Sequence, residues 1–285
     1  MAGWTRENLR HLGTMFKQGA NPAAAVYESL GTDLFLAAGP GWLNVGYWRS
    51  DGDPAEAADA PRELVRHLAD VLPRRGTIID VGNGLGAQDP VIADVALPSR
   101  LIAINITEMQ LRAGAERLAL ARARPVCADA TRLPLASGCA DGLISVEAAF
   151  HFPSRALFYA EARRVLRRGG IVSIGDVAVQ RWPRGIKELA AGAANVRFWG
   201  LKRASAQSAD EMLRLLKRAG FEDIEVQRCG ERTIDPMVAF CSEQLARGVN
   251  APRLQSWGAA RMLDTWRILR RSGVIDYVLI RATAA

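Results

Sequence analysis

The stretch that most constrains this fold is residues 77–89, which read Thr-Ile-Ile-Asp-Val-Gly-Asn-Gly-Leu-Gly-Ala-Gln-Asp. An apolar strand pattern leads through Asp80 into three alternating glycines, Gly82, Gly84 and Gly86. Glycine lets a backbone turn with positive φ and leaves no side chain between the main chain and a ligand. A strand, such a loop and a following helix are typical of the nucleotide cradle in doubly wound α/β folds.

The glycine loop by itself leaves its ligand open. Gly82, Gly84 and Ala87 also fit the G-x-G-x-x-A fingerprint of dinucleotide-binding proteins, which is a weak signal when it stands alone. Asp80 favours a cationic ligand, such as the ammonium of an amino acid, over a pyrophosphate. A tight structural turn without a ligand is the third interpretation.

Composition narrows the class of protein. The 285 residues, 49% of them hydrophobic, are enough for one large domain or one domain with an elaborated cap. No apolar run reaches the ~20 residues of a membrane span, and the first thirty residues show no secretory signal. The four cysteines lack C-x-x-C spacing, which argues against zinc and disulfide frameworks, and Cys127 is expected as small core filler. These features predict a cytoplasmic protein without a bound metal.

The net charge of +7 raises the hypothesis of a nucleic-acid partner. The basic residues are mostly single arginines spread through Ala- and Leu-rich helical stretches, so solvated helix faces explain most of them. A nucleic-acid partner is therefore disfavoured, and an anionic small substrate is compatible with the charge.

From residue 77 onward the pattern alternates between strands and helices. Strands are expected at 77–81, 101–106, 124–128, 142–146, 170–179, 224–226 and 277–280. Capping boxes are expected at Thr107–Gln110 and Ser208–Glu211. Ser154 is expected to cap a helix that buries Leu157 and ends at Gly169. This alternation predicts a parallel sheet covered by helices on both faces.

Three segments do not fit a minimal alternating fold. Residues 1–75 form an N-terminal helical and aromatic segment, in which Trp42, Tyr47 and Trp48 are either an anchor under the sheet or a lid. Within the core of residues 76–285, the stretches 180–205 and 231–273 are too long for simple loops. We expect both stretches to form a helical cap over the carboxyl edge of the sheet and to supply most acceptor contacts.

Several motifs between residues 76 and 180 occur together in one order. They are Asp80–Gly86, the Cys-Ala-Asp-Ala-Thr-Arg-Leu-Pro of 127–134, and the Glu-Ala-Ala-Phe-His-Phe of 147–152, with Gly-Tyr-Trp of 46–48 upstream. In this combination the chain resembles the class I S-adenosylmethionine-dependent methyltransferases, in their small-molecule, natural-product branch. The resemblance implies a Rossmann-like sheet that is mostly parallel, has an antiparallel last strand and carries a helical cap.

The same resemblance implies S-adenosyl-L-methionine as the cofactor. The residues expected to bind it are Tyr47, Asp80, Gly82, Asn83, Gly84, Gly86, Asn105, Gln110, Asp129, Ala130 and Glu147. One position departs from the family pattern, because Asn105 stands where many members have an acid that binds the ribose hydroxyls. An amide can still bond a hydroxyl, but more weakly than a carboxylate.

His151 and Asp176 are the candidate catalytic bases. His151 follows the fourth expected strand, and Asp176 lies in the apolar fifth strand, where an unpaired carboxylate would be costly. Members of the family that methylate sugar hydroxyls use a His and an Asp at these positions as bases. The alternatives are a histidine that only packs or caps, and an aspartate that is a structural hydrogen-bond acceptor.

The sequence thus favours methyl transfer from S-adenosylmethionine to a small-molecule secondary metabolite, with O-methylation preferred. The first alternative is C-methylation of a prenyl diphosphate, held by the basic residues Arg49, Lys187, Arg197 and Lys202. Further alternatives are a nicotinamide-dependent oxidoreductase and a binding protein without catalysis. A nucleic-acid methyltransferase is disfavoured because Glu147-Ala-Ala-Phe replaces the usual Asn/Asp-Pro-Pro-aromatic motif. A homodimer stays open.

Overall fold

The computed structural model describes residues 39, 41–199, 205–248 and 253–285, and of residues 197–199 and 253–255 it describes the backbone alone. Several expectations therefore fall outside the described residues: most of the N-terminal segment, Lys202, and the side chains of Arg197, Phe198 and Trp199.

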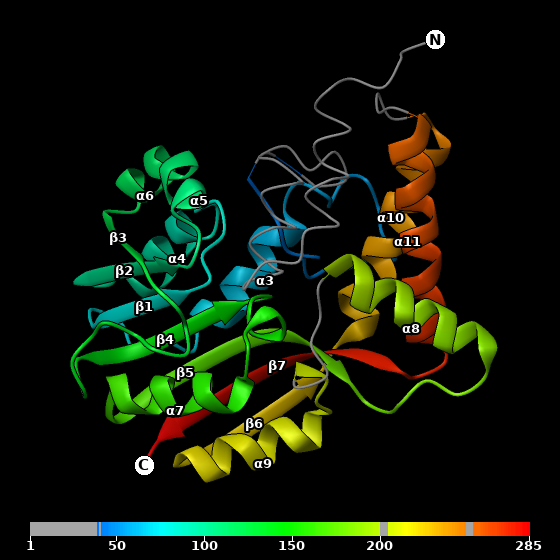
Figure 1. Cartoon of the computed structure of the whole chain (residues 1–285). Helices are drawn as coiled ribbons and strands as arrows, with labels where there is room; N and C mark the ends of the chain where they lie inside the picture. The colour runs from blue at the N-terminus through cyan, green and yellow to red at the C-terminus, as the bar shows by residue number, and fades with distance from the viewer. Residues whose placement is uncertain (1–38, 40, 200–204, 249–252) are drawn as a thin grey trace.

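A seven-stranded sheet in the order β3-β2-β1-β4-β5-β7-β6 forms the centre of the molecule (Figure 1). The strands are β1 (Thr77–Val81), β2 (Arg100–Asn105), β3 (Ala123–Cys127), β4 (Ala140–Val146), β5 (Leu166–Val179), β6 (Phe221–Arg228) and β7 (Ile275–Ala284). Strands β1 to β5 are parallel, and β7 runs antiparallel to both β5 and β6. The expected mostly parallel sheet with an antiparallel last strand is confirmed.

Helices cover both faces of this sheet. Those associated with the sheet are α3 (Ala60–Ala69), α4 (Asp89–Ala96), α5 (Glu108–Ala113), α6 (Ala115–Leu120), α7 (Arg155–Val165) and α9 (Ala209–Ala219). Neighbouring strand residues point to opposite faces, so Ile78 joins the core under α3 and α4 while Ile79 joins the core under α7 and α9. Two apolar cores thus hold the sheet rigid from either side.

All seven expected strands form, and several local details differ. The box at Ser208 and Glu211 is confirmed, whereas Thr107 makes no side-chain cap because Asn105 and Gln110 bond each other instead. The helix capped by Ser154 ends at Val165 rather than Gly169, because β5 already begins at Leu166 opposite Ala140.

Two burial expectations are wrong. Leu157 is 56% exposed because it lies on the outer side of α7, and Cys127 is exposed at the end of β3, which is an edge strand of the sheet. An edge strand has only one neighbour and leaves part of its length uncovered.

The two long insertions leave the sheet at the same edge. Helix α8 (Ile186–Trp199) follows the end of β5, while η3 (Gly230–Arg232), α10 (Ile234–Ala246) and α11 (Arg253–Arg271) connect β6 to β7. Val179 pairs with Ile275 and Arg228 pairs with Val278, so both insertions begin and end at the carboxyl edge of the parallel strands. The amide of Asn195 on α8 donates to Thr265 on α11 at 2.8 Å, which joins the insertions to each other (Figure 1).

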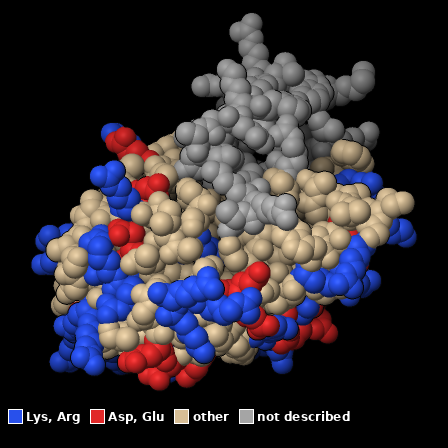
Figure 2. All heavy atoms as spheres, turned by 60° about the horizontal axis from the view of Figure 1, so that its bottom comes forward, with Lys and Arg blue, Asp and Glu red and all other residues tan. Residues whose placement is uncertain are grey.

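Basic residues on the face of α7 and α9 have acidic neighbours. Figure 2 shows Lys and Arg across this face with Asp and Glu among them. Arg164 pairs with Glu161 at 2.7 Å, and Arg167 pairs with Asp141. This mixture fits solvated helix faces better than a nucleic-acid patch. Within the described ranges, the helices are all too short or too polar to cross a membrane.

Candidate active site

A pocket opens where β1, β2 and β4 end. It encloses about 920 Å³ of space between protein atoms, and part of that space is open to solvent. Its wall consists of residues 41–44, 81–85, 87–88, 104–107, 110, 128–130, 146–148 and 151–153. Among the described residues, α8, α10 and α11 add nothing to this wall. The pocket therefore belongs to the sheet and to the aromatic segment upstream of it.

Gly82 and Gly84 shape the floor of the pocket. Both have positive φ, of 82° and 57°, and both line the pocket. A Cβ on Gly82 would lie 2.3 Å from Cβ of Ala148, and one on Gly84 would lie 3.1 Å from Leu43 Cδ1. Gly86 does not line the pocket; its backbone lies against Leu118 of α6 instead. Two glycines thus form the cradle and the third allows close helix packing.

Asp80 lies behind the pocket wall. Both of its carboxylate oxygens are 2.8 Å from Nε2 of Gln88, and it is Gln88 that lines the pocket. Burial, and then the charge of Asp89, raise the pKa of Asp80 well above its ordinary value, while the bond from Gln88 opposes the shift. Burial also raises the pKa of Asp89 to about 7, although Asn83 donates to it at 3.2 Å. A cation in the pocket would relieve this cost by favouring both ionised carboxylates.

Asn105 organises the loop between β2 and α5. Its amide nitrogen donates to the carbonyl of Gly84 at 3.1 Å and to Oε1 of Gln110 at 3.0 Å, and its oxygen accepts from the backbone of Thr107 at 3.0 Å. Asn105 and Gln110 both line the pocket. An aspartate could not make the two donated bonds. The amide that departs from the family pattern therefore ties the second strand to the glycine loop.

Asp129 and Ala130 form the wall after β3. Oδ1 of Asp129 accepts from both the backbone nitrogen and the hydroxyl of Thr131, each at 2.8 Å. These bonds fix the turn, so the carboxylate has one orientation at the pocket wall.

Glu147 connects three distant parts of the chain. It directly follows β4, has a positive φ of 51° and lines the pocket. Its Oε1 accepts from the amide of Val45 at 2.9 Å and from the hydroxyl of Tyr277 at 3.1 Å. Burial raises the pKa of Glu147 to about 8, against these two bonds and with a smaller contribution from the charge of Asp176.

The aromatic segment lies partly in the core and partly at the pocket. Trp42 is 7% exposed and lines the pocket, whereas Trp48 is 1% exposed and packs on Phe240. Tyr47 does not line the pocket; its ring stacks on His67 at 4.2 Å. The segment thus combines the two roles considered for it, anchor and wall, in different residues.

His151 and Asp176 occupy different environments. His151 ends η1 (Ala149–His151), lines the pocket and has its ring centroid 3.9 Å from that of Phe150. Asp176 is fully buried, does not line the pocket and pairs with Arg155 at 2.8 Å. Burial raises its pKa, and Arg155 opposes that shift most strongly. Only His151 faces the space in which a reaction could occur.

Sequence reasoning missed several residues of the wall. Leu43, Asn44, Gln88, Ile106 and Phe152 all line the pocket. Ile106 directly follows Asn105 and is 44% exposed although apolar, which suits the flat face of a base. Gln88 could have been found from its position after the glycines, whereas Leu43 depends on tertiary packing that no local pattern encodes.

The donor set fits an adenosyl amino acid. Buried carboxyls with raised pKa values suit its cationic centres, the glycine floor admits backbone contact, and the wall at Asp129 can accept bonds from an amino group. Within the described parts of the chain, His, Cys, Asp and Glu side chains form no group that could hold a metal ion.

The sequence is similar to a known domain family and to known methyltransferases. Residues 79–174 match the family described as methyltransferase domain. The chain is 26% identical over 233 residues to erythromycin 3''-O-methyltransferase of Saccharopolyspora erythraea, covering 78% of this chain and 76% of that protein. It is 29% identical over 250 residues to 27-O-demethylrifamycin SV methyltransferase of Amycolatopsis mediterranei, covering 84% and 89%.

The fold has a counterpart among solved structures. The cyclopropane synthase MmaA2 from Mycobacterium tuberculosis aligns with a TM-score of 0.75 over 94% of this chain and 99% of that one, at 15% identity. This likeness shows the shared Rossmann-like fold. Together, the glycine cradle, the matching domain and the related enzymes establish the chain as an S-adenosylmethionine-dependent methyltransferase.

Proposed function

We propose that the enzyme methylates a hydroxyl group of a small-molecule secondary metabolite. The observation that carries the proposal is that His151, a side chain able to accept a hydroxyl proton, lines the same pocket as the glycine cradle. The relatives support it, since they are named for O-methylation of erythromycin and for methylation of a rifamycin.

In this proposal different residues of the pocket wall bind different parts of the cofactor. Gly82 and Gly84 bring backbone amides to its amino-acid end, with Asn83, Gln88 and the carboxyl of Asp80 behind them. In the proposed arrangement Asn105 and Gln110, which line the pocket, bind the ribose hydroxyls, and the pocket residues Asp129, Ala130 and Ile106 contact the adenine. Tyr47 and Gly86 act from outside the wall by supporting it.

The bound cofactor supplies a methyl group already activated by a sulfonium. The protein then needs to align the acceptor oxygen with that carbon and to exclude water, and alignment supplies most of the rate enhancement. His151 accepts the hydroxyl proton as the acceptor oxygen bonds to the methyl carbon and the carbon–sulfur bond breaks, which leaves S-adenosylhomocysteine.

The cap remains part of this proposal. Helices α8, α10 and α11 lie at the edge of the sheet where the pocket opens, and Trp182 is 56% exposed just before α8. We expect residues 180–205 and 231–273 to enclose the acceptor, to exclude water, and to set its class, including any anionic group it carries. A homodimer is compatible with the same arrangement.

The C-methylation alternative gains no support from the described residues. A prenyl diphosphate needs cationic side chains beside the pocket. The two candidates for this role among the described residues, Arg49 and Lys187, lie elsewhere. Arg49 is within 3.5 Å of Glu63 with its side chain 76% exposed, and Lys187 lies on the exposed side of α8. Neither lines the pocket.

The test uses labelled cofactor and three candidate acceptors. The enzyme is incubated with methyl-labelled S-adenosylmethionine and, in separate reactions, 27-O-demethylrifamycin SV, erythromycin lacking its 3''-O-methyl group, or geranyl diphosphate. We expect label in an ether methyl of at least one hydroxylated macrocycle and none in geranyl diphosphate. Label in geranyl diphosphate alone would instead support the C-methylation alternative.

A further inference from the structure

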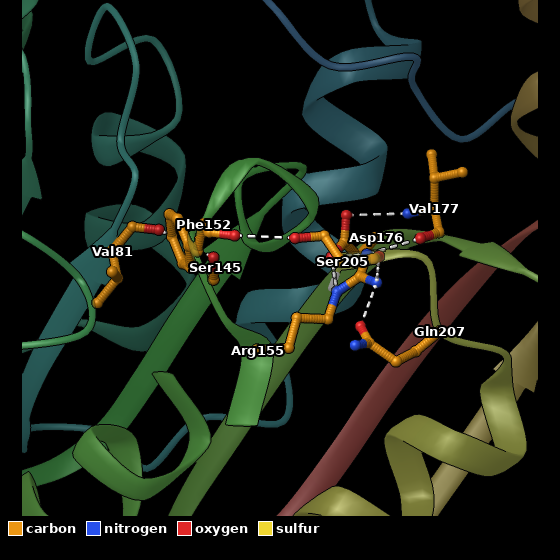
Figure 3. A network of polar contacts seen from close by, with 8 residues as sticks. All are labelled: Val81, Ser145, Phe152, Arg155, Asp176, Val177, Ser205 and Gln207. Carbon is orange, nitrogen blue, oxygen red and sulfur yellow. Dashed lines mark hydrogen bonds and ion pairs between the residues drawn. The ribbon is translucent and has the colours of Figure 1, made fainter. Parts of the chain in front are cut away.

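Arg155 is the first residue of α7 and is fully buried. Its guanidinium donates to Oδ2 of Asp176 from Nε at 3.2 Å and from Nη2 at 2.8 Å. The same group donates to the carbonyl of Val177 at 2.8 Å, to Oε1 of Gln207 at 3.0 Å and to the carbonyl of Ser205. Figure 3 shows Arg155 reaching all four partners from one position. Every arm of the guanidinium is thus bonded, as a buried charge requires.

Asp176 also interacts with backbone groups, including one in the turn that carries His151. Its Oδ1 accepts from the backbone of Val177 at 2.9 Å, and the backbone amide of Phe150 lies near enough to lower the pKa of the carboxyl. Phe150 is the middle residue of η1, and its ring packs against His151. Asp176 therefore interacts with η1 one residue away from the histidine.

Ser205 holds the other end of the same turn. Its hydroxyl donates to the carbonyl of Phe152 at 2.8 Å, while its own carbonyl accepts from Arg155 (Figure 3). Phe152 lines the pocket and directly follows His151. Ser205 and Gln207 lie between α8 and α9, on the stretch that returns from the α8 insertion to the sheet. The turn 150–152 thus interacts with Asp176 before His151 and is bonded to Ser205 after it.

From these contacts we propose that Arg155 and Asp176 form a positioning pair, which fixes the direction of His151 and ties it to the segment returning from α8. Asp176 acts through the turn and not on the acceptor, because its oxygens are bonded to protein groups and it does not line the pocket. The catalytic meaning of the pair rests on the proposed role of His151, and the geometric claim stands without it.

The experiment follows the ring signals of His151 in the full-length enzyme carrying ¹³C-labelled histidine. The chain has only three histidines, and His67 on α3 provides an internal reference. The variants are Asp176→Ala, Asp176→Asn, Arg155→Lys and Ser205→Ala, each with S-adenosylhomocysteine bound. We expect all four to shift or broaden the His151 signal and to leave that of His67 unchanged. Arg155→Lys, which keeps the charge, is expected to have a smaller effect than Asp176→Ala.

The matched control is Arg164→Lys. Arg164 lies on the same helix, pairs with Glu161 at 2.7 Å and donates to the carbonyls of Leu133 and Leu135, but it has no bond to the turn. We expect this variant to lower the melting temperature without moving the His151 signal. S-adenosylhomocysteine affinity should stay within about threefold in every variant, because the pair does not line the pocket.

Turnover gives the second readout. With an acceptor probe, Asp176→Ala should lower kcat roughly 10²-fold with little change in KM for the cofactor, as expected for a misplaced base. An unchanged His151 signal in folded Asp176→Asn and Ser205→Ala would overturn the positioning claim, as would an equal shift in Arg164→Lys. If His151→Gln keeps full turnover while the signals move as expected, the proposed base is wrong and the positioning pair stands.

Discussion

The hydroxyl of Tyr277 donates a hydrogen bond of 3.1 Å to Glu147, 130 residues earlier in the chain. The same carboxyl oxygen accepts from the backbone of Val45 at 2.9 Å. One partly buried carboxyl thus joins the antiparallel last strand, the end of β4 and the aromatic segment that lines the pocket. The folded protein favours the protonated form of the Glu147 carboxyl near neutral pH, because burial raises the pKa of this carboxyl to about 8.

The first prediction is that Glu147→Gln reduces the pH dependence of stability. The pKa of Glu147 rises from 4.5 to about 8 on folding, so the folded state binds the proton more tightly than the unfolded state. The stabilisation is complete below about pH 4.5 and is lost as the pH rises through 8. Glutamine keeps an oxygen for Val45 and Tyr277 and carries no charge.

The measurement is the free energy of unfolding by urea between pH 5 and pH 9, in about five steps. We expect the wild type to lose stability across this window more steeply than the variant. The control is Glu225→Gln on β6, whose side chain is 72% exposed. Parallel curves for wild type and Glu147→Gln would show that this carboxyl does not retain a proton in the fold.

The second prediction is that S-adenosylmethionine binding releases protons near neutral pH. Asp89 and Glu147 have pKa values raised by burial to about 7 and about 8, and a cation favours their ionised forms. Affinity for the cofactor should therefore increase as the pH rises from 7 to 8.

Calorimetry in buffers of different ionisation enthalpy measures the number of protons that are released when the ligand binds. S-adenosylhomocysteine lacks the sulfonium charge and should release fewer protons. Asp89→Asn should reduce the release for both ligands. Proton uptake on binding S-adenosylmethionine would contradict the charge assignment.

The third prediction concerns Asn105→Asp. Although an acid is common at this position in the family, here it would lose the bonds donated to Gly84 and Gln110 and would face their oxygens. The residue is 6% exposed, so the cost should be about 1–3 kcal/mol of stability. We also expect weaker binding of S-adenosylhomocysteine. Tighter binding at unchanged stability would mean that the amide has no organising role.

The fourth prediction separates backbone strain from ligand contact at the glycine loop. Gly84 and Gly138 have similar positive φ values of 57° and 64°, but Gly84 lines the pocket and a Cβ on Gly138 would meet nothing within 4 Å. Alanine at either site should cost about 1 kcal/mol through its backbone conformation. Cofactor affinity, measured by titration, should fall only for Gly84→Ala, and Gly84→Val should abolish binding. Equal affinity in the two alanine variants would place the cofactor away from Gly84.

Much of the fold could be predicted because its signals are local. The strands around Asp80 and Asp176 are apolar runs between glycines and charged turns, and each forms where the pattern indicates. The boundary expected at Gly169 differs, because pairing with Ala140 extends β5 backward into the expected helix. Strand pairing is a tertiary interaction and overrides local signals.

The candidate site could be predicted only where a motif encodes it. Gly82, Gly84, Asp129 and His151 all line one pocket, whereas Asp80 and Asp176 lie behind its wall. Sequence spacing placed these acids near the site, but their partners Gln88 and Arg155 decide which way each carboxylate faces.

The most direct test of the central claim is calorimetric titration of the full-length enzyme with three ligands, S-adenosylmethionine, S-adenosylhomocysteine and NAD. We expect both adenosyl ligands to bind with micromolar affinity, on the order of −8 kcal/mol, and NAD to give no heat of binding. Gly138→Ala should bind like the wild type and Gly84→Val should not bind. Binding of NAD with no heat from either adenosyl ligand would contradict the assignment of this pocket to a methyl donor.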